Sequence, residues 1–333
     1  MKPVRCAVVG LGMIGHEHAR VLAGSPLADL LACCDLDPGT ASRAPAGVPV
    51  TSDLDELLDT PQLEAVFVCT PQETHRQVAQ RALHKGLYVF CEKPAAHTLE
   101  DTDALIATPE AQAGRLVIGH TLRFSPDYLA VHRAVSTGEV GRVLSMAARR
   151  CVPGFEGKLI AARTNLAVEV GIHDIDIMRW LAGDIETVYA EQATMGVTGD
   201  GLTDAVVGTL RFASGAVATI EINWIMSSES DLKADYRLAV FGTKGSAFAE
   251  FSAPIVRVFG GQTAPTGWRD DVHGSQSGVL VTEDEHFLAV VRGMRSWPIT
   301  LADARAAVAV AVALNESATY GHPVRVAAEG VRP

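Results

Sequence analysis

The sequence predicts an α/β protein: a doubly wound parallel sheet, followed by an α+β domain with an open, largely antiparallel sheet. Three observations predict this fold. The first third of the chain alternates apolar segments with amphipathic ones, and the later part carries successive short strands joined by tight turns. The length of 333 residues suits two domains. We expect their boundaries at 1–121 and 122–333.

The first domain is expected to alternate strands with helices. Its strands are apolar throughout, which is typical of a parallel sheet covered on both faces, with right-handed crossovers. The expected strands are 5–9, 30–34, 65–69, 87–91 and 116–119, and the expected helices are 14–23, 53–58, 75–84 and 99–107.

The second domain is expected to place helices on one face of its sheet. Ser125 followed by Pro126 predicts a helix start, and Gly/polar-rich residues 263–278 indicate a loop. Short loops at 214–215 and 243–245 suit hairpins. The expected strands are 206–212, 216–224, 236–241 and 246–251, and the expected helices are 126–136, 169–181 and 301–313.

Composition and charge narrow the class of protein. The formal net charge of −11 disfavours nucleic acid and anionic membranes as partners, because both attract basic patches. No apolar segment approaches the length of a membrane span, and the first residues lead directly into a strand rather than a signal peptide. The six cysteines lack zinc spacing and suggest reduced, buried thiols. The sequence therefore predicts a cytoplasmic protein.

A glycine-rich turn follows the first expected strand and opens the first helix. Its residues are Gly10, Leu11, Gly12, Met13, Ile14 and Gly15. The glycines permit a tight turn, close approach of the backbone to a pyrophosphate, and close packing of helix on sheet. Amides near Met13 and Ile14 lie at the positive end of the helix dipole and are expected to bind the phosphates.

Asp35 ends the second expected strand, twenty positions after Gly15. A carboxylate there can accept hydrogen bonds from both ribose hydroxyls of NAD and repels the 2′-phosphate of NADP. Asp37 competes for this role, but Asp35 is nearer the end of the strand. The sequence therefore predicts a dinucleotide site for NAD.

Two further strand ends carry polar residues. Thr70 and Pro71 follow one strand, with His75 one turn further on, and Glu92 and Lys93 follow the next, before Pro94. Ligands of a doubly wound sheet lie outside the carboxyl ends of its strands. We therefore expect these side chains to face the cofactor, with Lys93 also at the substrate.

Glu169 and His173 are four residues apart, so a helix would place them on one face. Histidine titrates near neutrality and can exchange a proton with a hydroxyl, while the carboxylate orients the ring. The spacing could also suit a metal, but no third ligand is within sequence reach, and no metal is expected. The segment 16–18, His-Glu-His, could also suggest a metal site. We expect its side chains instead to face solvent or to pack beside the phosphates.

With these signals in one order, the chain resembles the Gfo/Idh/MocA family, which includes glucose–fructose oxidoreductase and inositol dehydrogenase. The resemblance covers nearly the whole chain. It is carried by the glycine turn with Asp35, Thr70-Pro71 with His75, Glu92-Lys93-Pro94, Arg123-Phe124-Ser125-Pro126, and the segments 171–176 and 241–245.

The resemblance implies a Rossmann domain and an open-faced sheet that joins subunits into a homodimer or homotetramer. It also implies that Lys93 polarises the reacting group and that Pro94 follows a cis peptide bond. Where the family pattern has an aspartate four positions before the histidine, this chain has Glu169, and residues 165–168 replace a glycine-rich run. The side chain of Glu169 is one methylene longer than that of aspartate, which changes where its carboxylate lies.

The expected reaction is NAD-dependent oxidation of a secondary hydroxyl on a sugar or an inositol-like cyclic polyol. His173 would accept the hydroxyl proton, Glu169 would orient its ring, and Lys93 would stabilise the developing oxyanion. Arg123 is the expected further substrate contact, with Lys158 and Arg163 as other candidates. The alternatives are a non-catalytic regulator that senses NAD or a sugar, and an NADP-dependent reductase or non-redox sugar enzyme.

Overall fold

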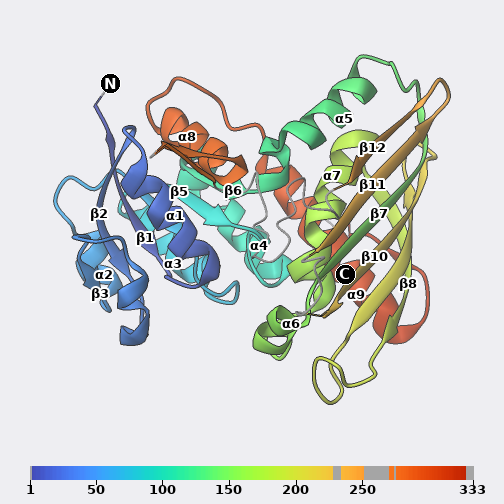
Figure 1. Cartoon of the computed structure of the whole chain (residues 1–333), viewed down its shortest axis with the longest axis horizontal. Helices are drawn as coiled ribbons and strands as arrows, with labels where there is room; N and C mark the ends of the chain where they lie inside the picture. The colour runs from blue at the N-terminus through green and yellow to red at the C-terminus, as the bar shows by residue number, and fades with distance from the viewer. Residues whose placement is uncertain (1, 228–233, 251–269, 274, 328–333) are drawn as a thin grey trace. The chain divides into compact units, whose positions relative to one another are not determined.

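The computed structural model describes residues 2–227, 234–250, 270–273 and 275–327 (Figure 1). The chain forms two compact units, of which the first comprises Met1–Phe124 and Gly267–Arg305 and the second Ser125–Thr266 and Ala306–Pro333. The first unit is thus discontinuous, since it includes residues within the expected second domain, 122–333. No helix within the described ranges combines the length and the apolarity needed to cross a bilayer.

The first unit contains the predicted parallel sheet. Six strands lie in the order β3-β2-β1-β4-β5-β6, and every pair is parallel. The strands are β1 (Val4–Val9), β2 (Ala28–Cys34), β3 (Val50–Thr51), β4 (Ala65–Val68), β5 (Tyr88–Glu92) and β6 (Leu116–Gly119). The order reverses between β1 and β4, so the ends of these strands form the switch point where such sheets bind ligands.

Alternate residues of each strand enter separate cores, because successive side chains of a strand point to opposite faces. In β1, Ala7 and Val9 pack in one core, while Cys6 and Val8 pack in the other. Helices cover both faces (Figure 1). They are α1 (Met13–Gly24), α2 (Leu54–Leu58), α3 (His75–His84), α4 (Leu99–Ile106) and α8 (Val279–Val291). This arrangement confirms the doubly wound sheet.

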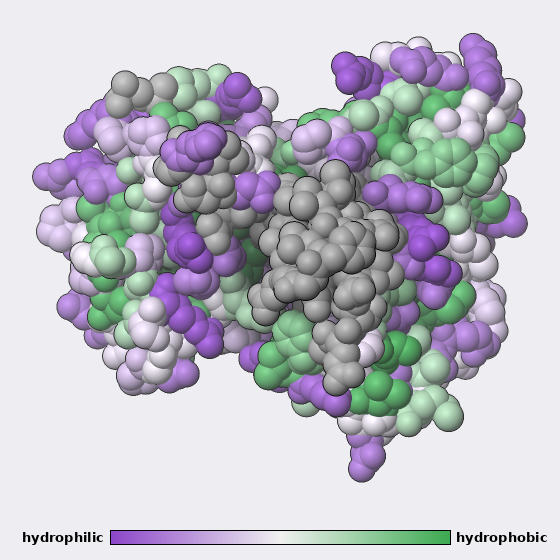
Figure 2. Space-filling view, viewed as in Figure 1, coloured by the Kyte–Doolittle hydropathy of each residue, from purple (hydrophilic) through white to green (hydrophobic). Residues whose placement is uncertain are grey.

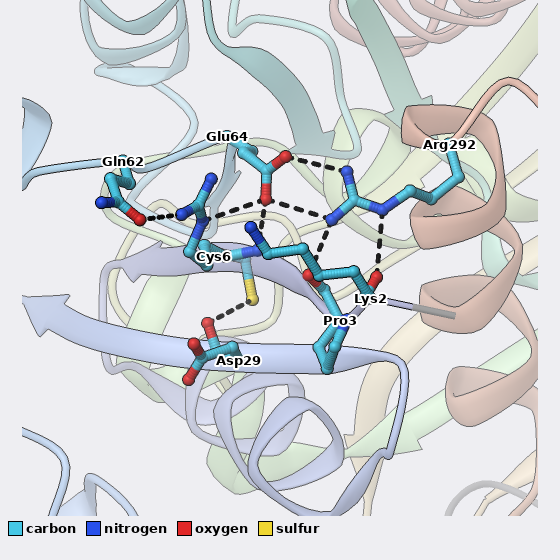
Figure 3. Close-up of polar contacts among 8 residues, drawn as sticks. Lys2, Pro3, Cys6, Asp29, Gln62, Glu64 and Arg292 are labelled. Atoms are coloured by element: carbon cyan, nitrogen blue, oxygen red, sulfur yellow. Dashed lines mark hydrogen bonds and ion pairs between the residues drawn. The ribbon is translucent and has the colours of Figure 1, made fainter.

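The returning segment is tied to the first strands by Arg292, at the end of α8. Its guanidinium forms a two-bond ion pair with Glu64, at 2.8 and 3.1 Å, and donates to the carbonyl oxygens of Lys2 and Pro3 (Figure 3). Glu64 also accepts from the backbone N–H of Arg5 at 3.0 Å. These hydrogen bonds from Arg292, with those from Arg5, lower the pKa of Glu64 to about 2 although burial opposes the shift.

The second unit contains the predicted open, largely antiparallel sheet. Seven strands lie in the order β12-β11-β7-β10-β9-β8-β15, and of these pairs only β7–β10 is parallel. The strands are β7 (Val143–Pro153), β8 (Ile185–Ala193), β9 (Ala205–Phe212), β10 (Val217–Met226), β11 (Asp235–Gly242), β12 (Ser246–Glu250) and β15 (Val324–Arg325). The helices are α5 (Pro126–Ser136), α6 (Gly154–Ile160), α7 (Ile172–Ala182) and, in large part, α9 (Leu301–Tyr320).

Some elements differ from the sequence prediction. The strand β7 was not predicted, because charged Arg150 occupies an inward-facing position that an ion pair makes tolerable. The helix expected at 169–181 begins at Ile172 and follows a π-helical turn, Ala167–Gly171. Helix α8 was not predicted, and α9 continues seven residues beyond 313.

The loop expected at 263–278 is only partly described. Residues 263–269 and 274 lie outside the described residues, as does position 251 of the last expected strand. The described remainder contains a two-stranded antiparallel pair, β13 (Asp270–Val272) with β14 (Ser275–Ser277). This part of the loop prediction was wrong, because polar residues can also pair as an exposed hairpin.

Candidate functional site

The three glycines of the turn have distinct structural roles. Gly10 has a φ of +93°, and a Cβ there would lie 2.6 Å from the carbonyl oxygen of Cys69. A Cβ on Gly15 would lie 1.9 Å from the carbonyl oxygen of Gly10, so helix and strand approach too closely for any side chain. A Cβ on Gly12 would meet nothing within 4 Å. The space beside Gly12 is open, as the approach of a pyrophosphate requires.

The start of α1 suits phosphate groups. Gly12 occupies the N-cap position and has no side chain that could accept from the first amides of the helix. Met13 and Ile14 are the first two helical residues. Helix N-terminal amides carry a partial positive charge and bind phosphate oxygens. The residues present therefore fit a dinucleotide, and the contact of Met13 and Ile14 with its pyrophosphate remains a prediction.

Asp35 follows β2 and faces the glycine turn. Its Oδ2 accepts a 2.6 Å hydrogen bond from the N–H of Leu11, and its Oδ1 accepts one of 2.9 Å from the N–H of Asp37. Asp37 instead caps the short 3₁₀ helix Pro38–Arg43, where its side chain accepts from Gly39. The geometry thus favours Asp35 over Asp37 as the ribose ligand, and that role remains a prediction.

His75 connects the ends of two strands. Its Nε2 lies 2.8 Å from the carbonyl oxygen of Thr70, after β4, and its Nδ1 lies 2.8 Å from the carbonyl oxygen of Pro94, after β5. The residue is 2% exposed. The ring therefore holds the segments of Thr70, Pro71 and Lys93-Pro94 together, and the predicted contacts of these residues with the cofactor remain predictions.

Lys93 lies directly after β5 and is partly buried. Its backbone N–H donates to Oε2 of Glu92 at 3.0 Å. The Lys93–Pro94 peptide bond is cis, which confirms the expectation drawn from the resemblance. Glu92 is 5% exposed, and its other oxygen, Oε1, contacts His18. The carboxylate of Glu92 is thus turned into the unit.

The expectation of solvent or phosphate-side packing for residues 16–18 was wrong for His18. The residue is fully buried, and its Nδ1 lies 2.8 Å from Oδ1 of Asp284 while its Nε2 lies 2.9 Å from Oε1 of Glu92. Sequence reasoning missed this cluster because Asp284 is 266 positions away. A usable signal was present: Glu283 and Asp284 share the helical spacing of Leu280 and Phe287, so acidic groups occupy a core face.

Arg123 lies at the end of the 3₁₀ helix Thr121–Phe124 and is 5% exposed. Its Nη1 is 3.7 Å from Oδ2 of Asp303. Lys158 and Arg163, the other candidate substrate contacts, are exposed residues of the second unit. The role of Arg123 at the substrate remains a prediction.

Glu169 and His173 both lie in the second unit, in consecutive elements. Glu169 belongs to the π-helical turn and His173 to the first turn of α7. A π-helical turn is wider than an α-helical one, and such turns are frequent at functional sites. The two residues are therefore not on one regular helix, and their joint role in proton transfer remains a prediction.

A buried ion pair fixes the helix that carries His173. Arg150 of β7 donates to both oxygens of Asp174, at 2.6 and 3.1 Å, and to the hydroxyl of Tyr128 at 3.3 Å. Its guanidinium also lies 4.4 Å from the ring centre of Tyr236. Burial raises the pKa of Asp174, although the charge of Arg150 opposes the shift. Since Asp174 follows His173, this pair anchors the first turn of α7.

The cysteines agree with the predicted thiols. All six are free and buried, and burial raises the pKa of Cys33 to about 12 and those of Cys34 and Cys151 to about 11. Among the described residues, no group of three or more His, Cys, Asp or Glu side chains is arranged to hold a metal ion.

Comparison with known proteins gives matches over both units. Residues 4–120 match the model of the oxidoreductase family with an NAD-binding Rossmann fold, and residues 128–248 match that of the GFO/IDH/MocA C-terminal domain. The inositol 2-dehydrogenase of Rhizobium meliloti is 30% identical over 76% of this chain and 77% of its own. The scyllo-inositol 2-dehydrogenase (NAD(+)) of Bacillus subtilis is 28% identical over 97% of this chain and 96% of its own.

Solved structures show the same fold. The myo-inositol 2-dehydrogenase of Lactobacillus plantarum superposes with a TM-score of 0.82, covering 98% of this chain and 100% of its own. Its sequence identity is 22%, so it supports the fold alone.

Proposed function

Because the chain belongs to the Gfo/Idh/MocA family of NAD-dependent oxidoreductases, we propose that it oxidises a secondary hydroxyl of a sugar or an inositol-like cyclic polyol. The observation that carries the proposal is the placement of Lys93 directly after β5, in the sheet whose turn and Asp35 suit NAD. The relatives named as inositol dehydrogenases support a cyclic polyol as the substrate class.

We assign the proton transfer to residues of this chain. NAD, when bound, accepts the hydride that leaves the carbinol carbon. His173 accepts the hydroxyl proton, with Glu169 orienting the imidazole, and the ammonium of Lys93 stabilises the oxygen as negative charge develops. Arg123 contributes a hydrogen-bond donor to further hydroxyls of the substrate.

The test is to supply a panel of inositols and sugars together with NAD and to measure the absorbance of the reduced nicotinamide that forms. The Lys93→Met variant should lose turnover by about 10³-fold while retaining NAD affinity, because oxyanion stabilisation acts only on the transition state. A His173→Asn variant should lose about 10²–10⁴-fold. Undiminished turnover of the Lys93 variant would contradict the assignment.

A double variant tests whether Lys93 and His173 act as a unit. If they do, the combined loss in the Lys93→Met/His173→Asn variant falls well short of the product of the single losses, as for residues that act as a unit. Multiplicative losses would show that the two residues contribute independently and do not act as a unit.

The regulatory alternative gives a different outcome in the same panel. A sensor would bind NAD yet reduce none of it with any polyol or sugar. Comparing the dissociation constants of NAD and NADP tests the second alternative, since Asp35 should repel the 2′-phosphate. The dehydrogenase names of the relatives favour the catalytic function.

We infer that the second unit's sheet joins copies of the chain into a homodimer or homotetramer. Hydrophobic side chains are exposed along it, and Figure 2 shows hydrophobic side chains at the surface of this unit. The exposed hydrophobic residues of its strands are Leu144, Val207, Val217, Phe241 and Phe248, of which the last is 60% exposed. Two of them, Phe241 and Phe248, contact each other with ring centres 5.6 Å apart, and contiguous exposed hydrophobic side chains mark interaction surfaces.

The oligomer can be tested by light scattering coupled to gel filtration. Phe248→Glu should lower the mass toward that of a monomer, because it places a charge in the proposed interface. Met195→Glu, at an even more exposed hydrophobic position outside the strands, serves as the control and should leave the mass unchanged. A monomeric parent protein would rule the interface out.

We also propose a cytoplasmic location, supported by the six unpaired, buried cysteines. Fractionation of cells that produce the protein, with a periplasmic or secreted marker as reference, tests this placement.

A further inference from the structure

Four titratable side chains are buried together beneath the end of β5. They are His18 of α1, Glu92 of β5, and Glu283 and Asp284 of α8, with exposed fractions of 5% or less. Taking charges out of water is unfavourable unless they are paired and hydrogen-bonded. Apolar side chains would fill the same space without this penalty, so the cluster calls for a functional explanation.

His18 is the bridge of the cluster. Its two ring nitrogens lie 2.8 Å from Asp284 and 2.9 Å from Glu92, and each contact requires an N–H if the carboxylates are ionised. Burial alone would lower the pKa of His18, but the charges of and hydrogen bonds to Asp284 and Glu92 raise it well above its ordinary value. His18 is therefore an imidazolium at neutral pH.

Glu92 connects the His18 ring to the backbone of Lys93. One oxygen faces the His18 ring, and the other accepts from the backbone N–H of Lys93 at 3.0 Å. On the far side of Lys93, the carbonyl oxygen of Pro94 is held by His75. The backbone of Lys93 is thus fixed before and after the residue.

Glu283 differs from the other acids of the cluster. It accepts a hydrogen bond from the hydroxyl of Thr121, and burial together with the charge of Glu92 raises its pKa well above the ordinary value. Glu283 does not contact the His18 ring, whose two nitrogens face Asp284 and Glu92.

We propose that His18 and Asp284 are positioning residues for Lys93: Asp284 orients the His18 ring, His18 holds the Glu92 carboxylate, and Glu92 sets the backbone of Lys93. The inference rests on the proposed function, because it takes Lys93 as the group at the reacting oxygen. A displacement of about 1 Å at such a group can lower a rate by about 10²-fold.

The first test is the His18→Gln variant, compared with its parent for kcat, KM and NAD affinity. We expect kcat per folded molecule to fall by about 10- to 100-fold with little change in NAD affinity. Glu92 would lose its cation, so its pKa should rise and a new ionisation should enter the kcat–pH profile between about pH 5 and 8. The groups facing Glu92 are His18 of α1, His75 of α3, Cys69 after β4, Cys91 of β5, Lys93, and Glu283 and Asp284 of α8.

The His18→Gln/Glu92→Gln double variant identifies the group that titrates. The new ionisation should disappear, and part of kcat should return, because the amide oxygen at position 92 can still accept from the Lys93 N–H. Glu64→Gln is the matched control: it weakens the same unit at an ion pair that does not contact Lys93, and kcat and its pH profile should not change. A purely structural His18 would give all variants the parental kcat per folded molecule.

Two further measurements keep the outcomes distinct. If His18→Gln does not fold, the Asp284→Asn variant replaces it in the kinetic test. Independently of the variants, NMR of the parent apoprotein should show both ring nitrogens of His18 protonated at neutral pH. A neutral ring overturns the proposal. If Lys93→Met loses turnover but His18→Gln keeps it with no new ionisation, only this inference fails; if Lys93→Met keeps turnover, the proposed function fails.

Discussion

The backbone N–H of Leu11 donates a 2.6 Å hydrogen bond to Oδ2 of Asp35. This bond joins the glycine turn after β1 to the residue that follows β2, and it directs the carboxylate toward the turn. The predicted ribose-binding carboxylate is thereby oriented by the backbone at two neighbouring strand ends.

Asp35→Asn should weaken NAD binding by about 10-fold or more, since a charged acceptor contributes more to a hydrogen bond than an amide does. The loss should be smaller for NADP, because the repulsion of its 2′-phosphate is also removed. Fluorescence titration or calorimetry with each dinucleotide measures both effects.

The matched control for Asp35 is Asp37→Asn. Asp37 accepts from Gly39 as a helix cap, and asparagine caps equally well, so NAD affinity should be unchanged. A larger loss of affinity at position 37 than at position 35 would reverse the assignment of the two aspartates.

Gly12→Ala and Gly15→Ala should separate cofactor binding from folding. A methyl group at Gly12 meets nothing within 4 Å, so the melting temperature should hold while NAD affinity falls. A methyl group at Gly15 would overlap the carbonyl oxygen of Gly10 at 1.9 Å and must push α1 away from the sheet, which should lower the melting temperature by several degrees. Calorimetry with and without NAD tests the pair; equal melting temperatures would contradict the packing role of Gly15.

The ion pair of Glu64 with Arg292 should make stability depend on acid pH. The pKa of Glu64 is lowered to about 2, so its contribution is complete above its ordinary pKa, about 4.5, and is lost as the pH falls toward 2. Glu64→Gln should therefore reduce the free energy of unfolding by roughly 2 kcal/mol at neutral pH, after allowance for partial exposure, and by little near pH 2. Urea unfolding at several pH values tests this, with exposed Glu73→Gln as the control; a difference that did not vary with pH would refute it.

Arg150→Met should lower the free energy of unfolding by about 3–5 kcal/mol, because it leaves the Asp174 carboxylate buried without its cation. The loss should be smaller at acid pH, where Asp174 is protonated. Adding Asp174→Asn should recover part of the loss, since no buried charge then remains. Chemical denaturation measures these free energies, and a double variant less stable than Arg150→Met would contradict the explanation.

The parts of the site that the sequence predicted are those formed by neighbouring elements. Gly10, Gly12, Gly15 and Asp35 lie within 26 positions, and the need for a tight turn followed by a strand-end carboxylate leaves a local pattern. The cis bond before Pro94 could be expected only through the resemblance, because no local rule distinguishes it from a trans bond.

The parts that the sequence did not reveal depend on distant contacts or irregular backbone. His18 has the same spacing as apolar residues of α1, and its partner Asp284 is 266 positions further on. The π-helical turn at Glu169 replaces what periodicity indicates as a continuous helix. A charged residue such as Arg150 at an inward position argues against a strand in the sequence. The strand β7 becomes understandable only from the ion pair of Arg150 with Asp174.

Because residues from near the end of the chain complete the first unit, this unit cannot finish folding early during synthesis. Phe287 and Leu288 of α8 complete one of its two cores, and Arg292 pairs with Glu64. A nascent polypeptide that has left the ribosome only through residue 124 therefore exposes the apolar surface that α8 later covers. An expression clone for the nucleotide-binding half must accordingly carry residues 267–305 as well, fused by a linker or supplied as a second fragment.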